Sequence, residues 1–447
     1  MKKLITLVLL FALLALTFTA CNEEEIDPCP FALHEHVWES GRNREWEDDI
    51  IAIAYYLFYS PRLTPRWEEM YEHFDEELQA YTIHRINTLV YNIPNLTDRE
   101  IQFSLVEIFA MFGDSLTAAF PNYGGIFPIM FFALNDGFYV HDTIVEYEHL
   151  LSSRLLAING IDIDEITFRF NRIISQSSTY RLRQEMMQGD MNCDYRLEFL
   201  GITDGTGMAE FTLMGIDGTV STYIISTVDS FESFTNSDRV ELDRNVLLLW
   251  SRPGETYWSE DFPEYNFVYF RLHDFHPPGG RITYLRNVLR RIDNFPLEEA
   301  VDRLVIDLRR NPGFGNQITQ FNMFDETDKL ETIYILIDNR TGYAASMFAY
   351  FIRKSVDADV IFVGEPTGSP EFFASHTMRI PFNTQLTNIS DSHRTEDLLM
   401  IVATGFFIPP TSDRTNVALY PDYFIPLTIE DLIAGRDPVL EFIKSRR

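Results

Sequence analysis

Three short apolar runs in the last third of the chain constrain its fold more than any other feature. Leu304–Leu308, Thr332–Ile337 and Val360–Val363 lack the alternation of a half-exposed strand, so each is expected to be a strand buried on both faces. A helical pattern from Gly342 to Lys354 separates the second run from the third. Strands that alternate with helices in this way indicate an α/β core with a largely parallel sheet.

The region upstream of this core divides into two parts. Helical periodicity covers Glu47–Tyr59 and Trp67–Asn87, and Thr97 with Glu100 forms a capping-box pattern that opens a third helix. Later segments are short β-like runs separated by turn signals such as Asn159-Gly160. We therefore expect a multi-domain α/β protein, with a helical N-terminal cap at 46–126, a β module at 127–240 and the α/β core at 241–447.

The charge of the chain excludes some partners. Its 447 residues carry a net charge of −31, while 46% of them are hydrophobic, which is ample for packed cores. Such an acidic surface repels phosphate backbones, so we expect no nucleic-acid partner. Binding of the folded body to anionic lipid is disfavoured for the same reason.

The first twenty residues have the pattern of a targeting segment. Lys2 and Lys3 precede the apolar stretch Leu4–Leu16, which is short for a membrane span. The small residues before Cys21 resemble a bacterial lipoprotein cleavage site, so we expect a signal peptide at 1–20, lipidation of Cys21 and a tether at 21–45. An ordinary secretory signal with an incidental cysteine is the alternative. The expected location is extracytoplasmic, on a bacterial membrane that the protein contacts through its N-terminal lipid only.

Cysteine usage adds little to the prediction of the fold. The mature chain would keep Cys29 and Cys193, and two cysteines cannot build a disulfide framework. The two thiols could pair outside the cytoplasm, or they could be unrelated.

Six segments occur in the order of one peptidase family. They are Gly113–Thr117 (G-D-x-H-T in the family), Leu155–Gly160 (an I-N-G turn), Val305–Gly313 (D-L-R-x-N-P-G-G), Ile335–Tyr350 (T-x-S-A-A-E-x-F-A-Y), Val363–Gly368 (G-E-x-T-G) and Pro421–Pro438 (P-D). Together they resemble the C-terminal processing (tail-specific) serine peptidases, in the branch with the tricorn core and the interphotoreceptor retinoid-binding protein repeats. The resemblance implies a PDZ-like β module and a crotonase/ClpP-like core.

The resemblance also implies a chemistry that needs no cofactor. A serine at the start of a helix would attack the substrate, a histidine would accept its proton, and the glycine turn would supply amides to an oxyanion hole. Asp307 and Arg309, within the strand-and-turn motif, are expected to form a structural ion pair rather than to act in catalysis.

This sequence departs from the family at the reacting positions. Tyr343 stands where the attacking serine belongs, and Leu116 stands where the histidine belongs. Phe314 replaces the second glycine of the turn and follows Gly313. A phenol has a reference pKa of about 10 and rarely attacks carbonyls, and leucine cannot accept a proton. We therefore expect a fold that has lost its serine chemistry.

Two alternatives would restore that chemistry. Ser346 lies about one helical turn after Tyr343 and could act as a displaced nucleophile, or it could bond to its own backbone as helix serines do. His376 follows Ser375, but neighbouring residues on a strand point to opposite faces, so a direct bond between them is doubtful.

His273 and His276 flank Asp274 and could be read as metal ligands. The Pro277–Gly280 run ends any helix there, so structural or peptide-contacting histidines are preferred and no metal is expected. The sequence thus favours an impaired peptidase that still binds peptide or unfolded protein segments. A serine peptidase with a rebuilt site and an envelope scaffold without a peptide ligand remain the alternatives.

Overall fold

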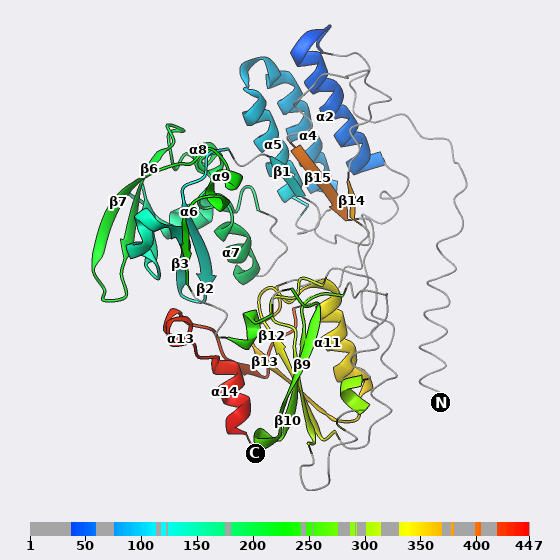
Figure 1. Cartoon of the computed structure of the whole chain (residues 1–447). Coiled ribbons are helices and arrows are strands. Elements are labelled where there is room, and N and C mark those ends of the chain that lie inside the picture. Colours follow the sequence, from blue (N-terminus) through cyan, green and yellow to red (C-terminus); the bar gives the residue numbers. More distant parts are fainter. Residues whose placement is uncertain are drawn as a thin grey trace.

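The computed structural model describes most of the chain with side chains. The described residues are 37–59, 76–112, 118–121, 124–174, 180–242, 247–252, 254–275, 287–290, 292, 301–313, 330–368, 377–379, 398–403 and 418–446. Figure 1 shows three parts: a group of helices, a β-rich module and an α/β core. No helix within these ranges combines the length and the apolar character needed to cross a bilayer.

Helices α2 (Gly41–Tyr59), α4 (Glu76–Asn92) and α5 (Asp98–Ala110) form the N-terminal part, with the short η1 (Ile93–Asn95) before α5. The predicted capping box is confirmed, because Thr97 and Glu100 each bond to the other's backbone N–H. The helix expected from Trp67 is described only from Glu76 onward. The residues that directly follow Phe112, beginning with Gly113, lie outside the described residues.

The β-rich part is one antiparallel sheet with helices against it. Its strands run in the order β2 (Ile129–Leu134), β3 (Gly137–Ile144), β4 (Arg154–Ile158), β6 (Met208–Met214) and β7 (Val220–Ser226), while β5 (Ile161–Asp162) pairs with β4 and β8 (Arg239–Glu241) with β3. The helices are η2 (Val145–Leu150), α6 (Ile163–Phe170), α7 (Tyr180–Gln188), α8 (Asp194–Phe199) and α9 (Phe231–Thr235).

The predicted turn between β4 and β5 is confirmed. Asn159 and Gly160 both have positive φ, 48° and 73°, which is why this dipeptide suits the turn. Helix α6 follows this turn and ends at Phe170.

The α/β core contains the predicted parallel sheet. Its order is β16 (Tyr423–Phe424), β13 (Asp359–Gly364), β12 (Thr332–Ile337), β11 (Arg303–Asp307), β10 (Phe267–Leu272) and β9 (Tyr257–Phe262), parallel except for the edge strand β9. Helix α11 (Tyr343–Ser355) covers one face and α14 (Pro438–Ser445) the other, so the three apolar runs are buried on both sides as expected. The remaining elements are η3 (Leu248–Trp250), η4 (Pro263–Tyr265) and α13 (Ile429–Ala434).

A small third sheet pairs strands that are far apart in the sequence. In it β15 (Leu398–Ala403) pairs antiparallel with β1 (Ala118–Pro121) on one side and with β14 (Thr377–Arg379) on the other. A strand from the expected helical cap is thus completed by a strand from the expected core region, a pairing that the sequence did not reveal.

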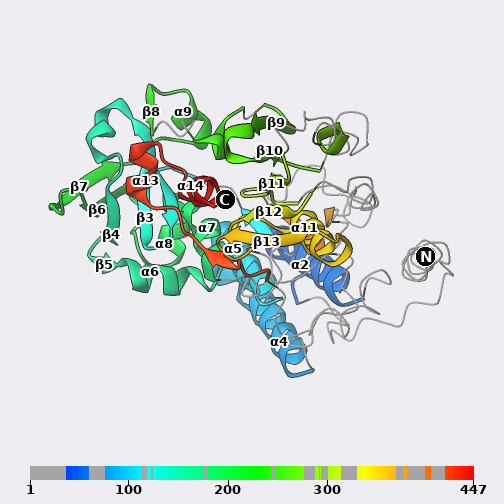
Figure 2. The same ribbon diagram turned by 90° about the horizontal axis from the view of Figure 1, so that it is seen from below.

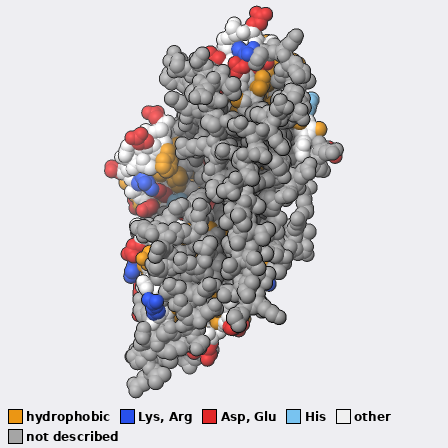
Figure 3. Space-filling model, turned by 90° about the vertical axis from the view of Figure 1, so that its right-hand side faces the viewer, with side chains coloured by type: hydrophobic (Ala, Val, Ile, Leu, Met, Phe, Trp, Pro, Cys, Tyr) orange, Lys and Arg blue, Asp and Glu red, His pale blue; other side chains and the backbone are white. Residues whose placement is uncertain are grey.

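The acidic excess is visible at the surface. Figure 3 shows Asp and Glu side chains along the described margin of one face. Cys193 is buried at the start of α8, where Arg196 contacts its sulfur at 3.4 Å, and this contact supports a packing role for the thiol. Cys21 and Cys29 lie outside the described residues.

Candidate active site

The candidate site lies where the carboxyl ends of β11, β12 and β13 meet. The turns that follow these strands are tied together by backbone and side-chain hydrogen bonds. Gly342 N donates to Asn311 O at 3.1 Å, Gly368 N donates to Thr341 O at 3.2 Å, and Thr341 Oγ1 donates to Leu308 O at 3.0 Å. Parallel strands end at one edge of the sheet, and ligands bind at that edge in open α/β folds.

Asp338 organises the turn that leads into α11. Its Oδ1 accepts the backbone N–H groups of Arg310 at 2.8 Å, of Arg340 at 3.0 Å and of Thr341 at 3.0 Å. The turn after β11 and the turn after β12 therefore share one carboxylate, which fixes the start of the helix relative to the glycine turn.

Tyr343 is the first residue of α11, and Gly342 is its N-cap. The start of a helix presents unpaired N–H groups and the positive end of the helix dipole. Tyr343 therefore occupies the position at which the resemblance puts the attacking serine. Its side chain lies outside the described part of the structure.

Gly313 packs directly against this helix start. Its φ is +76°, and a Cβ placed on it would lie 2.1 Å from Gly342 O and 2.5 Å from Ala344 N. Only glycine fits both the left-handed backbone and the close approach. Asn311 Oδ1 accepts the Gly313 N–H at 2.9 Å, which holds the turn. Phe314, the next residue, lies outside the described residues.

Ser346 makes the contact expected of a structural helix serine. Its side chain is 2% exposed, and its Oγ donates to Thr341 O at 3.3 Å. Among the described residues, no imidazole contacts this hydroxyl. This bond is the one expected of a helix serine that bonds to its own backbone.

His273 lies beside the same turn, just after β10. Its neighbour Leu272 accepts a hydrogen bond from Asn311 Nδ2 at 3.0 Å. Burial, followed by the positive charge of Arg271, lowers the pKa of His273 to about 4, and its buried Nε2 has no hydrogen-bond partner among the described residues. His273 is therefore neutral near pH 7. His276, His376 and Leu116 lie outside the described residues, within which no cluster of acidic, His and Cys side chains suits a metal ion.

Asp307 and Arg309 form the expected ion pair, and the pair belongs to a larger buried network. Arg309 Nη2 lies 2.6 Å from Asp307 Oδ2 and 2.8 Å from Asp437 Oδ2, and the Tyr269 hydroxyl donates to Asp307 at 2.6 Å. Burial alone would raise the pKa of Asp307, but Arg309 and Arg271 outweigh it and lower that pKa to about 2. The network holds the strand ends in place and leaves no proton to exchange near neutrality.

A cavity of about 260 Å³ lies between the N-terminal part, the β module and the turn before α11. It is bounded by α5, β1, α7 and the turn before α11, and Ala118, Ala119, Glu185 and Arg340 are among its lining residues. Leu116 precedes this lining by two residues, and Tyr343 follows it by three. A side chain of a bound segment could enter this space.

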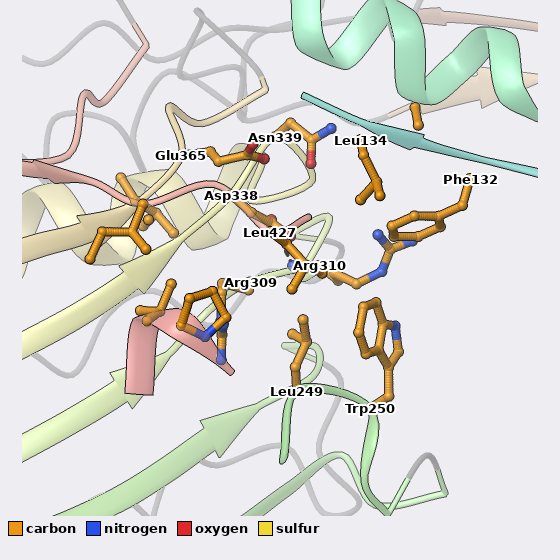
Figure 4. A pocket seen from close by; sticks show the side chains of 16 residues that line it. Phe132, Leu134, Leu249, Trp250, Arg309, Arg310, Asp338, Asn339, Glu365 and Leu427 are labelled. Atoms are coloured by element: carbon orange, nitrogen blue, oxygen red, sulfur yellow. Dashed lines mark hydrogen bonds between the residues drawn. The ribbon is translucent and has the colours of Figure 1, made fainter. Parts of the chain in front are cut away.

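A second, smaller cavity of about 40 Å³ separates the β module from the core. Figure 4 shows the Arg310 side chain between the rings of Phe132 and Trp250. Its guanidinium carbon is 5.0 Å and 5.7 Å from the two ring centres, and Nη2 is 3.1 Å from Glu185 Oε1. Glu185 also accepts Arg340 Nε at 2.7 Å.

Sequence reasoning missed the buried carboxylate Glu185 and its two partners, Arg310 and Arg340. Arg310 stands within the strand-and-turn motif at a position that the family leaves open, which was the available signal. Glu185 had none, because it is 125 residues away from Arg310 in the chain.

Comparisons with known proteins bear on the fold. The chain matches no family model and no curated protein sequence. Its structure is similar to that of mature CPAF complexed with lactacystin, with a TM-score of 0.57 and 11% sequence identity over 89% of this chain and 97% of CPAF.

The chain has the fold of mature CPAF.

Two further solved structures align with TM-scores below 0.5. The tricorn protease aligns with 90% of this chain and 36% of its own length at a TM-score of 0.37 and 13% identity. A putative S41 protease from Bacteroides fragilis aligns with 74% of this chain and 84% of its own length at a TM-score of 0.32 and 13% identity. The predicted α/β multi-domain class is confirmed, and so is the resemblance at the level of the fold. The substitutions at the reacting positions stay an interpretation of the sequence.

Proposed function

We propose that this protein binds peptide or unfolded protein segments and does not hydrolyse them. It would be an extracytoplasmic, lipid-anchored relative of the tail-specific serine peptidases whose acyl-transfer chemistry has been lost. The fold that the chain shares with mature CPAF does not depend on this proposal.

One observation carries the proposal: a tyrosine begins α11, while Gly313, the first glycine of the turn, still packs against the helix start. Gly313 still packs on the helix start, so the framework for charge stabilisation is retained. The phenol of a tyrosine is a poor acyl-transfer nucleophile, and the aligned base position holds Leu116. Removing one member of a catalytic triad lowers turnover by about four to six orders of magnitude.

The cavity beside the helix start supports retention of binding. Its lining combines apolar residues, such as Ala119, with the charged residues Glu185 and Arg340. Ligand sites in proteins commonly have this composition. A bound segment would reach this space without any covalent step.

Hydrolysis is tested with a matched pair of gain-of-function variants. The purified mature chain is incubated with a fluorophosphonate probe and a panel of unstructured peptides, and neither labelling nor cleavage is expected. Tyr343→Ser alone should stay inactive, because it lacks a base, whereas Tyr343→Ser with Leu116→His should gain labelling. Labelling of the natural chain that Ser346→Ala abolishes would instead establish a rebuilt peptidase.

Binding is tested separately, by titrating labelled unstructured peptides and following fluorescence anisotropy. Saturable binding without cleavage is the expected result. If no peptide in a broad panel binds, the protein is a scaffold rather than a peptide-binding protein.

The proposed lipid anchor rests on the sequence alone. Cys21 follows a short apolar segment that ends in small residues. Metabolic labelling with a fatty acid should mark the natural chain and not Cys21→Ala, while Cys29→Ala should be labelled normally. Labelling that persists in Cys21→Ala would contradict the anchor.

A further inference from the structure

Strand β7 forms an open edge of the module's sheet. Figures 1 and 2 show its hairpin with β6 projecting from the body of the molecule. β7 pairs with β6 on one side, and none of the described strands pairs with its other side. A seven-residue strand with one free edge can accept another extended chain.

The hydrogen-bond register shows which backbone groups face outward. Gly215 N donates to Thr219 O and Thr227 N donates to Gly207 O, so the odd-numbered residues of β7 between them pair with β6. The backbone groups of Val220, Thr222 and Ile224 therefore point away from β6. Tyr147 hydrogen-bonds the backbone of Ser226, which closes the edge at that end.

The opposite edge of the sheet, β2, is already occupied. Ala133 N on β2 donates to Gln188 Oε1 at 2.6 Å, and Gln188 belongs to α7, which packs along this strand. Almost all of β2 is buried. Of the two strands that end the main strand order, β7 is therefore the one with its outer side open to another strand.

The exposed face of β7 is apolar and unprotected. Val220 is 54% exposed and Ile224 is 73% exposed. Residues 208–226 contain no Lys, Arg or Pro, the residues that usually discourage pairing at a sheet edge.

Among the described residues, the β6–β7 hairpin and η2 contribute only acidic charged side chains apart from His149, whose ring packs against Tyr223 of β7. The hairpin contributes Glu210, opposite Ile224, and Asp217 in its turn, while Glu146 and Glu148 flank Tyr147 on η2. A second copy of a chain with a net charge of −31 would be repelled, whereas an extended segment with basic side chains would be attracted.

We infer that β7 is a docking edge for an extended polypeptide segment that alternates apolar or β-branched residues with lysine or arginine. The segment adds a strand to the sheet through the backbone of Val220, Thr222 and Ile224. This inference rests on the proposed peptide-binding role, and it names the surface and the chemistry of the ligand.

The test is a titration of the full mature chain with three blocked nine-residue peptides. The first alternates Lys and Val, the second replaces Lys with Glu, and the third is the Lys-Val peptide N-methylated at alternate residues. Only the first should bind tightly, because the second reverses the charge and the third lacks the N–H groups that pair strands. A loss of about tenfold or more is expected for each change.

Two variants locate the binding surface. Thr222→Pro removes one outward N–H without breaking the pairing with β6, and Ile224→Lys adds a charge to the edge. Each should weaken binding of the Lys-Val peptide about tenfold, while Ile216→Lys, at an exposed position in the hairpin turn, should bind as the natural chain does. Circular dichroism checks that all three fold.

The outcomes separate the inference from the proposed function. If peptides bind the natural chain and both edge variants equally, β7 is not the docking edge, although the protein still binds peptides. If no peptide binds the natural chain, the proposed function fails as well. Self-association that Thr222→Pro abolishes would make the occupant a second copy and overturn the assignment to a basic segment.

Discussion

Single residues decide how the candidate site is built, and Gly313 is the clearest case. Its positive φ and its approach to Gly342 leave no room for a side chain. Gly218, in the β6–β7 turn, has a similar φ of +80° but open space around it. An alanine at Gly218 would meet backbone strain alone, whereas an alanine at Gly313 would meet both strain and a steric clash.

We predict that Gly313→Ala lowers the free energy of unfolding by more than Gly218→Ala does. The control should lose about 1 to 2 kcal/mol through strain alone. Gly313→Ala should lose at least about 2 kcal/mol more, because the added methyl group displaces the start of α11. Urea denaturation of both variants provides the comparison, and equal losses would show that Gly313 is not tightly packed in solution.

The pKa shifts of His273 and Asp307 predict how stability depends on pH. Both groups have a lower pKa in the folded chain than when unfolded, so the unfolded state binds more protons and acid destabilises the fold. The free energy of unfolding should therefore decrease as the pH falls from about 6.5 to about 4, where His273 takes up its proton. It should decrease further from about pH 4 to about pH 2, where Asp307 does so.

Asp49 opposes this trend, since burial raises its pKa to about 7. We therefore compare each variant with the natural chain at every pH. The difference in unfolding free energy between His273→Gln and the natural chain should change between about pH 6.5 and 4 and be constant above pH 7. A difference that is independent of pH would contradict the lowered pKa of His273.

At the scale of helices and strands, the sequence predicted the elements whose pattern lies within one short segment. Strands β11, β12 and β13 were found within a residue because continuous apolar runs have few other places to lie. The edge strand β9 was missed, since its mixture of exposed and buried residues gives no clear period. The motif placed Tyr343 at the start of α11, whereas the contacts of Arg310 with Phe132, Trp250 and Glu185 join distant segments and carry no local signal.

The capping box of α5 gives a prediction for an element. Thr97→Ala removes the side-chain acceptor for Glu100 N and should cost about 1 kcal/mol of stability. Thr88→Ala is the matched control, because Thr88 is an exposed residue within α4 whose hydroxyl bonds only to His84 O. Thermal unfolding should show a lower midpoint for the first variant, and a larger loss in the control would contradict the capping role.

At the scale of the whole molecule, Glu185 links the β module to the core. It lies on α7 and pairs with Arg310 and Arg340, which belong to the turns around the candidate site. Its side chain is buried, so removing it would leave two arginines without their carboxylate.

We predict that Glu185→Ala destabilises the protein by about 3 to 5 kcal/mol and loosens the contact between the two parts. Hydrogen exchange should rise both in α7 and in the turn before α11. Glu165→Ala, which removes the exposed partner of Arg169, should change stability by less than about 0.5 kcal/mol. If exchange rises only in α7, the two parts are not linked through this residue.

The pairing of β1 with β15 has a consequence for the order of events during synthesis. β1 leaves the ribosome before the whole β module and the parallel strands β10 to β13, and its partner strand begins only at Leu398. Nascent chains fold as their segments emerge. β1 therefore cannot pair with β15 until the β module and most strands of the core have been synthesised. Closure of this small sheet is therefore a late step, and a chain that stops before Leu398 would leave β1 without the neighbour that completes it.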